Sequence, residues 1–340
     1  MAIPDTPLVS ILVPVYNVDA YIERCARSIF EQTYPNLEIV FVDDGCTDSS
    51  ISILQKVISE YPCHQEKVII IHHPHNKGLA AARNTAVSFC HGDFVCHVDS
   101  DDWIDSDAVG ALVRRQQETD ADIVYTSGYY KHEKELRKID CHGWSNDKDA
   151  LLTNILQDKA TICMWSKLIK KSLYTGNHII CNERGSFYED FQALTRLVYY
   201  SRSIARLDAD IYHYNRLNPG SFVSNLSHDI ELQRQGLSSI QVVCDFFQDK
   251  EKTYLNLVQQ FCLCYLHKML NANFRHKNRK GYDEFLNLLN QLEKANWSVI
   301  GWDRPWNRVV DQNYHLKRLI TVFQRVRQKA VSAPRRMLNK

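Results

Sequence analysis

The 340-residue sequence has no apolar run long enough to cross a bilayer, and residues 1–10 lack the basic start and apolar core of a signal peptide. We therefore expect neither a membrane span nor a secretory leader. The eleven cysteines follow no framework spacing, which indicates reduced thiols rather than a disulfide scaffold. The net charge of +1 gives no reason to expect nucleic-acid binding by the chain as a whole.

Two common phosphate-binding signatures are also missing. No two of the twelve glycines lie two positions apart, so the G-x-G-x-x-G pattern of dinucleotide-binding folds is absent. The chain has no G-x-x-x-x-G-K-[ST] segment either, which excludes a P-loop. Any nucleotide must therefore be held by other means.

Strand-like and helix-like segments alternate through the first 130 residues. This alternation predicts βαβ units, an α/β fold and a mainly parallel sheet. From about residue 225 only helical patterns remain, which suggests an α/β domain over residues 1–225 and a helical region with a basic tail over 226–340. Strands are expected at 8–15, 37–42, 68–71, 94–98 and 123–127, and helices at 20–32, 48–60, 79–89, 107–118, 255–270 and 282–294.

Polar side chains follow each of the first four expected strands. Ligands of parallel sheets bind beyond the carboxyl ends of the strands, so these residues are expected to share one site. Asp43 and Asp44 follow the second strand and are suited to accept hydrogen bonds from a base and a ribose. An Asx-turn is an equally good interpretation of this pair.

Three carboxylates, Asp99, Asp101 and Asp102, follow the fourth strand within four positions. An EF-hand loop starting at Asp99 would need Gly and Glu where Ile104 and Gly110 stand, so a calcium loop is excluded. A hard cation held by one or two carboxylates and substrate phosphates fits better, which predicts Mn²⁺ or Mg²⁺. The alternative is a solvated turn with a helix cap.

Four segments together resemble the family 2 glycosyltransferases of the GT-A fold, a nucleotide-diphospho-sugar transferase fold with a Rossmann-like sheet. They are Val13-Pro14-Val15-Tyr16-Asn17, residues 42–48 (VDDGCTD), residues 76–84 (NKGLAAARN) and Asp99-Ser100-Asp101-Asp102. Cys46 stands where that family usually has Ser, a turn position of little consequence. The resemblance covers roughly residues 7–130 and implies an inverting transferase with a nucleotide-sugar donor and a divalent metal.

The resemblance also implies individual roles. Asp190 in Tyr188-Glu189-Asp190-Phe191 is expected to be the general base and Glu189 to support it, although charge at a helix start would explain the pair as well. A nucleotide site is expected at Pro14, Tyr16, Asn17, Asp43, Asp44, Lys77, Arg83, Ser100, Asp101 and Arg216. Metal ligands are expected among Asp99, Asp101, Asp102 and His213, and acceptor contacts at Trp165 and Lys167. The alternatives are a surface role for Arg83, a core role for Trp165 and a structural role for His213.

The function implied is transfer of a hexose or N-acetylhexosamine, with a UDP-sugar as the favoured donor, to a glycan or lipid-linked acceptor. Bacterial capsule, O-antigen or exopolysaccharide assembly in the cytoplasm is the setting that the resemblance implies. Residues 312–340 carry eight basic and no acidic side chains, and form either a solvated helix or a contact with the cytoplasmic face of the inner membrane. A nucleotidyltransferase and a non-catalytic sugar-nucleotide or glycan-binding protein on the same fold are the alternative functions.

Overall fold

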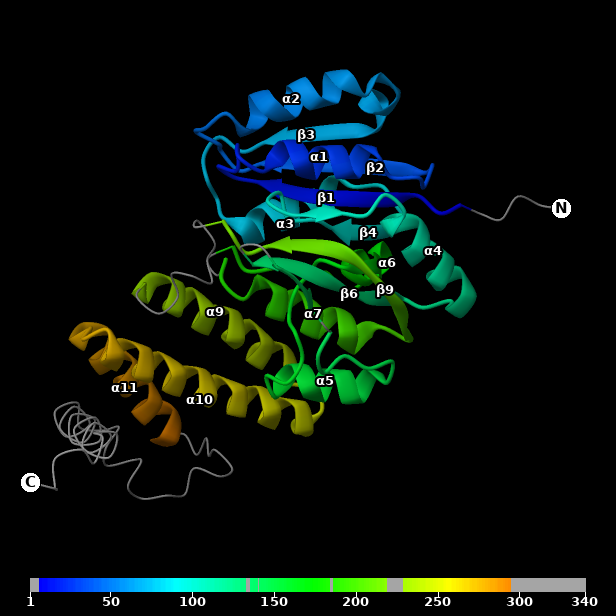
Figure 1. Cartoon of the computed structure of the whole chain (residues 1–340). Coiled ribbons are helices and arrows are strands. Elements are labelled where there is room, and N and C mark those ends of the chain that lie inside the picture. The colour runs from blue at the N-terminus through cyan, green and yellow to red at the C-terminus, as the bar shows by residue number, and fades with distance from the viewer. Residues whose placement is uncertain (1–5, 133–134, 140, 184–185, 219–228, 295–340) are drawn as a thin grey trace, which may run out of the picture. The chain divides into compact units, whose positions relative to one another are not determined.

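A computed structural model describes residues 6–132, 135–139, 141–183, 186–218 and 229–294 (Figure 1). The chain divides into two compact units, residues 1–224 with 231–258, and residues 225–230 with 259–340. The sheet and the candidate site belong to the first unit. Among the described helices, none is both long enough and apolar enough to span a membrane. The basic tail at 312–340 lies outside the described residues.

A parallel block of four strands forms one half of the sheet. The strands are β1 (Val9–Val15), β2 (Leu37–Asp43), β3 (Val68–His72) and β4 (Phe94–His97). Strand β1 lies between β2 and β4, and β3 lies outside β2 (Figure 1). Every residue of β1 and β2 is buried, as expected for strands of a sheet covered on both faces.

The other half of the sheet mixes strand directions. Strand β8 is antiparallel to both β4 and β6, whereas β9 runs parallel to β6 and antiparallel to β5. Within the described residues the order is β3-β2-β1-β4-β8-β6-β9-β5, with β7 paired to β6. The prediction of a mainly parallel α/β sheet is confirmed, and the antiparallel strands are an addition to it. These strands are β5 (Trp103–Ile104), β6 (Ile123–His132), β7 (Glu135–Ile139), β8 (Lys167–Lys170) and β9 (Ile204–Asn215).

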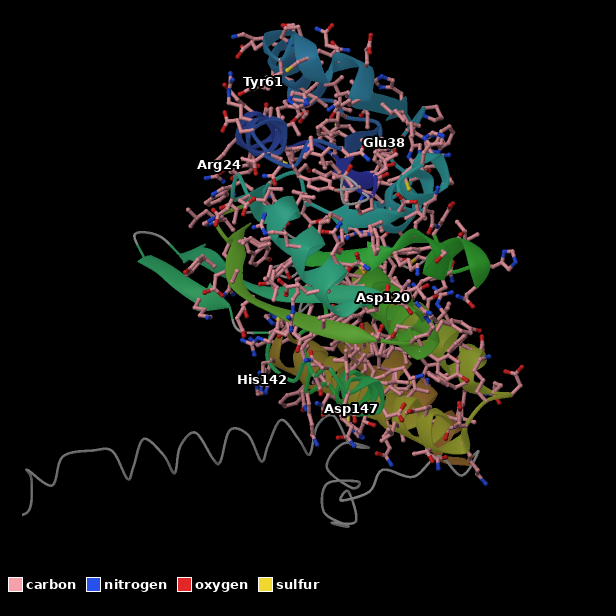
Figure 2. The ribbon with its side chains drawn as sticks, turned by 90° about the vertical axis from the view of Figure 1, so that its right-hand side faces the viewer. Arg24, Glu38, Tyr61, Asp120, His142 and Asp147 are labelled. Atoms are coloured by element: carbon pink, nitrogen blue, oxygen red, sulfur yellow. The ribbon has the colours of Figure 1, made fainter. Side chains whose placement is uncertain are left out.

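Helices flank the sheet, and small residues allow one of them to approach it closely. In α3 (Leu79–Phe89) the alanines 80, 81, 82 and 86 are buried, and the helix packs on β1 and β2. The helix α5 (Lys148–Leu156) is capped by Asp147, whose Oδ1 accepts a hydrogen bond from the Ala150 N–H at 2.9 Å (Figure 2). The remaining helices of the first unit are α1 (Ile22–Phe30), α2 (Ser50–Glu60), the 3₁₀ helix η1 (Pro62–Lys67), α4 (Ala108–Thr119), α6 (Lys171–Gly176), α7 (Glu189–Tyr200) and α9 (Ile230–Phe247).

The helical prediction for the C-terminal region is confirmed over the described residues. The helix α10 (Lys252–Arg275) begins in the first unit and ends in the second, and α11 (Arg279–Lys294) belongs to the second.

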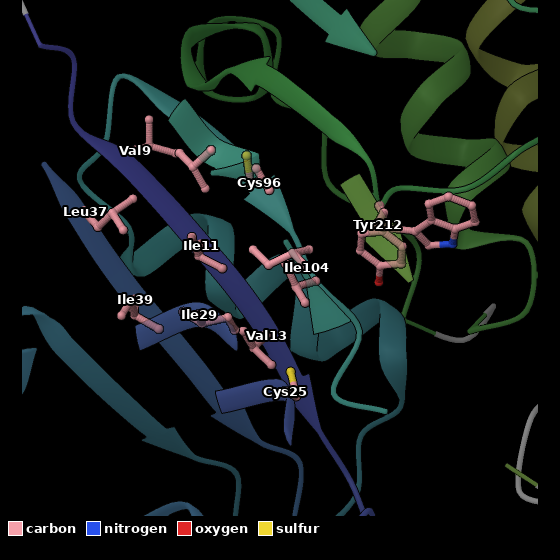
Figure 3. Packing of buried hydrophobic residues seen from close by; sticks show 14 of the residues in the cluster. Val9, Ile11, Val13, Cys25, Ile29, Leu37, Ile39, Cys96, Ile104 and Tyr212 are labelled. Carbon is pink, nitrogen blue, oxygen red and sulfur yellow. The ribbon is translucent and has the colours of Figure 1, made fainter. Parts of the chain in front are cut away.

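The core lies against the parallel half of the sheet. Val9, Ile11 and Val13 of β1 lie on the same face of the sheet as Leu37 and Ile39 of β2, in one cluster with residues of the flanking helix α1 (Figure 3). Burying an aliphatic side chain of this size contributes about 1.5–3 kcal/mol. The strands are therefore held firmly up to residues 15 and 43, where the loops with the candidate site residues begin.

Candidate active site

The first loop at the carboxyl edge of the sheet follows β1. Tyr16 is 44% exposed, and Asn17 adopts a left-handed backbone with φ of 49°. The Asn17 side-chain oxygen accepts a hydrogen bond from the Thr47 N–H at 2.9 Å, which ties this loop to the one after β2. Pro14 is buried within β1. Two neighbouring loops thus meet where the sequence predicts the nucleotide.

Asp43 closes a turn at the end of β2. Its Oδ1 accepts a hydrogen bond from the Cys46 N–H at 2.8 Å, and its Oδ2 lies 2.8 Å from His72 Nδ1. Burial opposes ionisation, but these hydrogen bonds hold the pKa of Asp43 below its ordinary value. The bond to the Cys46 N–H reaches the third residue along the chain, one further than in an Asx-turn, but it likewise stabilises the loop, and the contact of Asp43 with a nucleotide stays a prediction.

Asp44 points into the protein and organises the loop after β3. Its Oδ1 accepts hydrogen bonds from the Lys77 N–H at 2.9 Å and faces His73 Nδ1 at 2.7 Å. Its Oδ2 accepts from the Gly78 N–H at 2.8 Å. Asp44 is 3% exposed and has three hydrogen-bond partners, so it holds the backbone of the loop after β3 in place. The side chain of Lys77 in this loop is exposed.

The three aspartates after β4 diverge, and Asp102 is the most deeply buried. Its Oδ2 accepts a hydrogen bond from the Tyr212 hydroxyl at 2.6 Å, and its Oδ1 from the Asn215 N–H at 2.7 Å. Burial and the charges of Asp101 and Asp99 raise the pKa of Asp102 well above its ordinary value. Both carboxylate oxygens of Asp102 are hydrogen-bonded to residues of β9. Asp102 therefore fixes the segment with the three aspartates to the sheet.

Asp99 and Asp101 remain at the edge. The Asp101 Oδ2 accepts a hydrogen bond from Asn218 Nδ2 at 2.8 Å, and its carboxylate is partly exposed. The Asp99 side chain is 24% exposed, with Oδ1 3.0 Å from Arg83 Nη2. Burial and the charges of Asp101 and Asp190, opposed by Arg83, raise the pKa of Asp99 to about 6. Ser100 between them is buried at 7% exposure.

His213 lies away from this pair of aspartates. Its Nε2 is 2.7 Å from Asp105 Oδ1, and its ring stacks on Trp103 at 4.9 Å between ring centroids. The structure therefore does not bring the four predicted metal ligands together. Within the described part of the chain, no group of three or more His, Cys, Asp or Glu side chains is arranged to hold a metal. Asp99 and Asp101 fit a cation whose other ligands are phosphate and water.

Arg83 is the centre of the charge network. It is only 5% exposed, so neither a surface role nor a freely accessible nucleotide contact describes it. Besides Asp99, its Nε lies 3.5 Å from Glu189 Oε1 and its Nη2 3.7 Å from Asp190 Oδ1. Burial opposes its charge, but the three carboxylates raise the pKa of Arg83. One guanidinium thus connects the aspartates after β4 with the acid pair of α7.

The acid pair opens α7. Tyr188 precedes it with a left-handed φ of 64°, and this turn directs Glu189 and Asp190 toward Arg83. The Glu189 side chain is 7% exposed and the Asp190 side chain 20%. Burial and the neighbouring Asp190 raise the pKa of Glu189 well above its ordinary value. The Oδ1 of Asp190 has no hydrogen-bond partner among the described residues, and Asp190 is the more accessible acid.

Two predicted acceptor residues lie in the interior. Trp165 is 7% exposed and stacks on Tyr212 at 4.7 Å and 13°, which agrees with the core interpretation. Lys167 is 1% exposed, donates to the Trp165 carbonyl at 2.9 Å and lies over the Trp144 ring at 4.4 Å. Their predicted contact with an acceptor stays a prediction, and neither presents an exposed surface. Arg216 follows β9 and is exposed.

Asn84 is a structural residue that the sequence reading passed over. Its side-chain amide donates to the Cys181 carbonyl at 2.8 Å, and its oxygen accepts from the Cys181 N–H at 2.9 Å. This pair fastens α3 to the segment that leads into α7. The partners are 97 positions apart, so no local pattern could have indicated them.

Comparison with known proteins identifies the family of this chain. A family profile described as "Glycosyl transferase family 2" matches residues 10–174. The chain is 30% identical over 253 residues to EpsH of Bacillus subtilis (strain 168), whose name classes it provisionally as a glycosyltransferase, covering 73% of this chain and 71% of EpsH. The chain belongs to the family 2 glycosyltransferases and is an enzyme of that kind.

Other relatives and solved structures extend the picture. Glycosyltransferase GlyA of Streptococcus pneumoniae serotype 4 is 32% identical over 63% of this chain and 31% of its own length. The crystal structure of S. aureus TarS 1-349 with UDP has a TM-score of 0.55 at 22% identity, covering 79% of this chain and 72% of that one. A mannosyltransferase of Pyrobaculum calidifontis with GDP-Man and Mn²⁺ has a TM-score of 0.53 at 18% identity, covering 79% and 76%. These structures show the GT-A fold.

Proposed function

We propose that this glycosyltransferase moves a hexose or N-acetylhexosamine from a UDP-sugar to a hydroxyl group of a glycan or lipid-linked acceptor, with inversion. The observation that carries the proposal is the position of Asp190. It is a partly exposed carboxylate that shares one guanidinium with Asp99. Single displacement needs one acidic group on the donor side and another on the acceptor side. Solved structures similar to this chain are complexes with UDP, UDP-GlcNAc and GDP-Man, which supports a nucleotide-sugar donor.

On the donor side, we assign Asp99 and Asp101 to a divalent cation, Mn²⁺ or Mg²⁺. Such a cation, when bound, stabilises the negative charge that develops on the leaving diphosphate. The Asn218 side chain orients Asp101, and Arg83 orients Asp99. Asp102 is left out of the ligand set because both of its oxygens are engaged with Tyr212 and Asn215. His213 is left out because its Nε2 pairs with Asp105 and because, among the described residues, it forms no metal-holding group with two other His, Cys, Asp or Glu side chains, although its Nδ1 has no hydrogen-bond partner there.

The nucleoside part of the donor is assigned to the exposed loops at the same edge. Tyr16 and Lys77 offer an aromatic face and a cation, and Asp43 offers an ionised carboxylate. Arg216, after β9, is assigned to the phosphates. Pro14, Asn17, Asp44 and Ser100 act mainly by holding these loops in place.

On the acceptor side, Asp190 takes the proton of the attacking hydroxyl group. Positioned base catalysis typically contributes about 10²–10⁴-fold in rate. Arg83 balances part of the charge of the acid pair and fixes its place relative to Asp99. Glu189, whose pKa burial raises, supports Asp190 without adding a second full negative charge.

We assign catalysis to residues 1–225 and a helper role to the helical region 226–340. Assembly of a bacterial surface polysaccharide in the cytoplasm, with the basic tail against the inner membrane, is the proposed setting. Relatives named chondroitin synthase and hyaluronan synthase are compatible with a polysaccharide product. The two alternative functions, a nucleotidyltransferase and a non-catalytic binding protein, gain no support from the family assignment.

Calorimetric titration of the full chain with UDP and GDP, each with Mn²⁺ and with EDTA, tests the donor assignment. We expect UDP to bind in the presence of Mn²⁺, and EDTA to weaken its binding by about tenfold or more. Asp101→Ala should remove this metal dependence. Asp105→Ala is the matched control, because it deletes a nearby carboxylate that pairs with His213 instead. A folded chain that binds neither nucleotide would contradict the proposal.

A further inference from the structure

A cavity of about 500 Å³ lies behind the acid pair, bordered by α3, α6 and α7 of the first unit. Pockets for small molecules usually have volumes of about 300–1,000 Å³, so this one is large enough for a ligand. Arg83 and Glu189 form its inner end together with His97. The proposed base Asp190 and the proposed metal ligands Asp99 and Asp101 are not among the lining residues, so the proposed transfer reaction gives the cavity itself no role.

Two buried polar atoms at the inner end lack hydrogen-bond partners among the described residues. They are Nη1 of Arg83 and Nδ1 of His97, on side chains that are 5% and 2% exposed. The other ring nitrogen of His97 lies 3.0 Å from the Tyr174 hydroxyl group, which fixes the orientation of the ring. Buried polar groups are nearly always satisfied, so these two atoms indicate a missing partner inside the cavity.

The charges around Arg83 restrict what this partner is. An anion would approach three carboxylates, Asp99, Glu189 and Asp190, that already share one guanidinium. A cation would meet the N–H groups of Arg83 itself. A hydroxyl group carries no charge, accepts a hydrogen bond from Arg83 and forms a second one with His97 in either tautomer.

Away from Arg83 and His97 the lining is mixed: it includes charged side chains such as Lys171 and Glu183 as well as a buried apolar part. Met164, Ile179 and Ala193 line it and are all at most 5% exposed. Ile180 also lines it and is 64% exposed, and Thr175 is exposed as well. The lining therefore runs from two unpaired polar atoms through an apolar section to residues at the protein surface.

We propose that this cavity binds a small uncharged amphiphile, an aliphatic alcohol whose hydroxyl group lies between Arg83 and His97 and whose chain lies against Met164 and Ala193. Because Arg83 also contacts Asp99 and Asp190, binding here is coupled to the donor site. This coupling rests on the proposed function, whereas the binding does not. The cavity is therefore an effector site.

Calorimetric titration of the full chain with 1-hexanol, hexanoate and hexylamine tests the binding. These probes share one chain length and differ in the charge of the head group. We expect 1-hexanol to bind about tenfold more tightly than either ion. Equal affinity for all three, or no binding of 1-hexanol, overturns the proposal and leaves ordered water as the partner of Arg83 and His97.

Two variants on α6 locate the binding. Thr175→Trp places a bulky side chain at the exposed part of the cavity lining, whereas Ser172→Trp adds the same side chain at an exposed position outside the lining. We expect Thr175→Trp to weaken 1-hexanol binding about tenfold and Ser172→Trp to change it less than about twofold. Equal effects of the two variants place the alcohol elsewhere and overturn the assignment.

The coupling between the cavity and the donor site is tested by measuring the affinity for UDP in the presence of Mn²⁺, without 1-hexanol and with saturating 1-hexanol. We expect a change of about threefold or more in wild type and none in Thr175→Trp. An unchanged UDP affinity with the alcohol bound refutes the effector role. Loss of UDP binding under all conditions would instead refute the donor assignment, so the two failures are distinguishable.

Discussion

The two acidic clusters of the site contain the same kinds of side chains in very different surroundings. After β4, Asp102 receives hydrogen bonds from a tyrosine hydroxyl group and a backbone N–H, and its two oxygens are both occupied. At the start of α7, Glu189 and Asp190 share a single guanidinium, and Asp190 Oδ1 has no hydrogen-bond partner within the described residues. An acidic motif can therefore contain structural carboxylates as well as carboxylates that are available for chemistry. Only the hydrogen-bond partners of each carboxylate distinguish the two.

The most severe test of this comparison is Asp190→Asn. The substitution keeps the shape of the side chain and removes the proton acceptor, so we expect transfer to fall by about 10²–10⁴-fold. Nucleotide affinity should stay within about threefold of wild type, since the donor carboxylates are untouched. Transfer rates with matched titrations of UDP and Mn²⁺ provide the measurement. A variant with normal transfer would remove Asp190 from the role of base.

Asp102→Ala should affect folding rather than chemistry. It leaves the Tyr212 hydroxyl group and the Asn215 N–H buried without their acceptor, which should lower the free energy of unfolding by about 2–4 kcal/mol. Asp101→Ala removes a partly exposed carboxylate and should change it by less than about 1 kcal/mol. Urea unfolding of the two variants makes the comparison, and equal losses would contradict it.

Arg83→Lys tests the link between the clusters. Lysine keeps the charge but cannot reach Asp99 and the acid pair with one planar group, so we expect kcat to fall about tenfold. The Kd of UDP with Mn²⁺ should change less than about threefold. A variant that loses nucleotide affinity and keeps kcat would show instead that Arg83 serves the donor alone.

The smallest expected effect concerns a structural acid outside the site. Asp122 is buried and receives hydrogen bonds from Arg202 at 2.9 and 3.0 Å. Burial opposes ionisation, but these bonds lower the pKa of Asp122, so its stabilisation is complete above the unfolded value of about 3.9 and is lost as the pH falls through the folded pKa. Asp122→Asn should therefore cost about 1–2 kcal/mol at pH 7 and less at pH 3.

Urea unfolding of wild type and Asp122→Asn at both values of pH measures this difference. Arg114→Ala is a suitable control, because the Arg114 side chain is 60% exposed in its pair with Asp107 and should contribute little at either pH. An Asp122→Asn penalty that is the same at pH 7 and pH 3 would contradict the assigned cause.

The parallel half of the fold could be predicted from the sequence because its signals are local. Strands β1 and β2 are apolar except for Ser10, Glu38 and Asp43, and α3 was expected at the residues where it occurs. In the other half of the sheet, β6 was expected at 123–127, but β5, β7, β8 and β9 could not be predicted this way. Strand β8 has four residues and β5 has two, and β9 contains Arg206, Asp208 and Asp210 among its apolar residues. These strands exist because partners far along the chain pair with them.

The candidate site, like the sheet, could be predicted from the sequence only in part. The residue types and their order indicated a donor edge and an acid pair, and the structure brings Asp99, Arg83 and Asp190 together. The distinction between Asp101 and Asp102 depends on Tyr212, which lies 110 positions from Asp102. No spacing rule contains that contact, so the sequence could not separate Asp102 from Asp99 and Asp101, and the metal set expected from the resemblance stays a prediction.

The bond pair between Asn84 and Cys181 also constrains how such enzymes recombine. An exchange of gene segments with a crossover between these positions would join an α3 from one parent to an acid-pair segment from another. The chimera keeps the bridge whenever the parent of α3 supplies Asn84, because the other end consists of the backbone N–H and carbonyl of residue 181, which any residue except proline provides. Segments that begin after position 181 can therefore be exchanged between such parents without loss of this bridge, as long as the backbone at position 181 keeps its path.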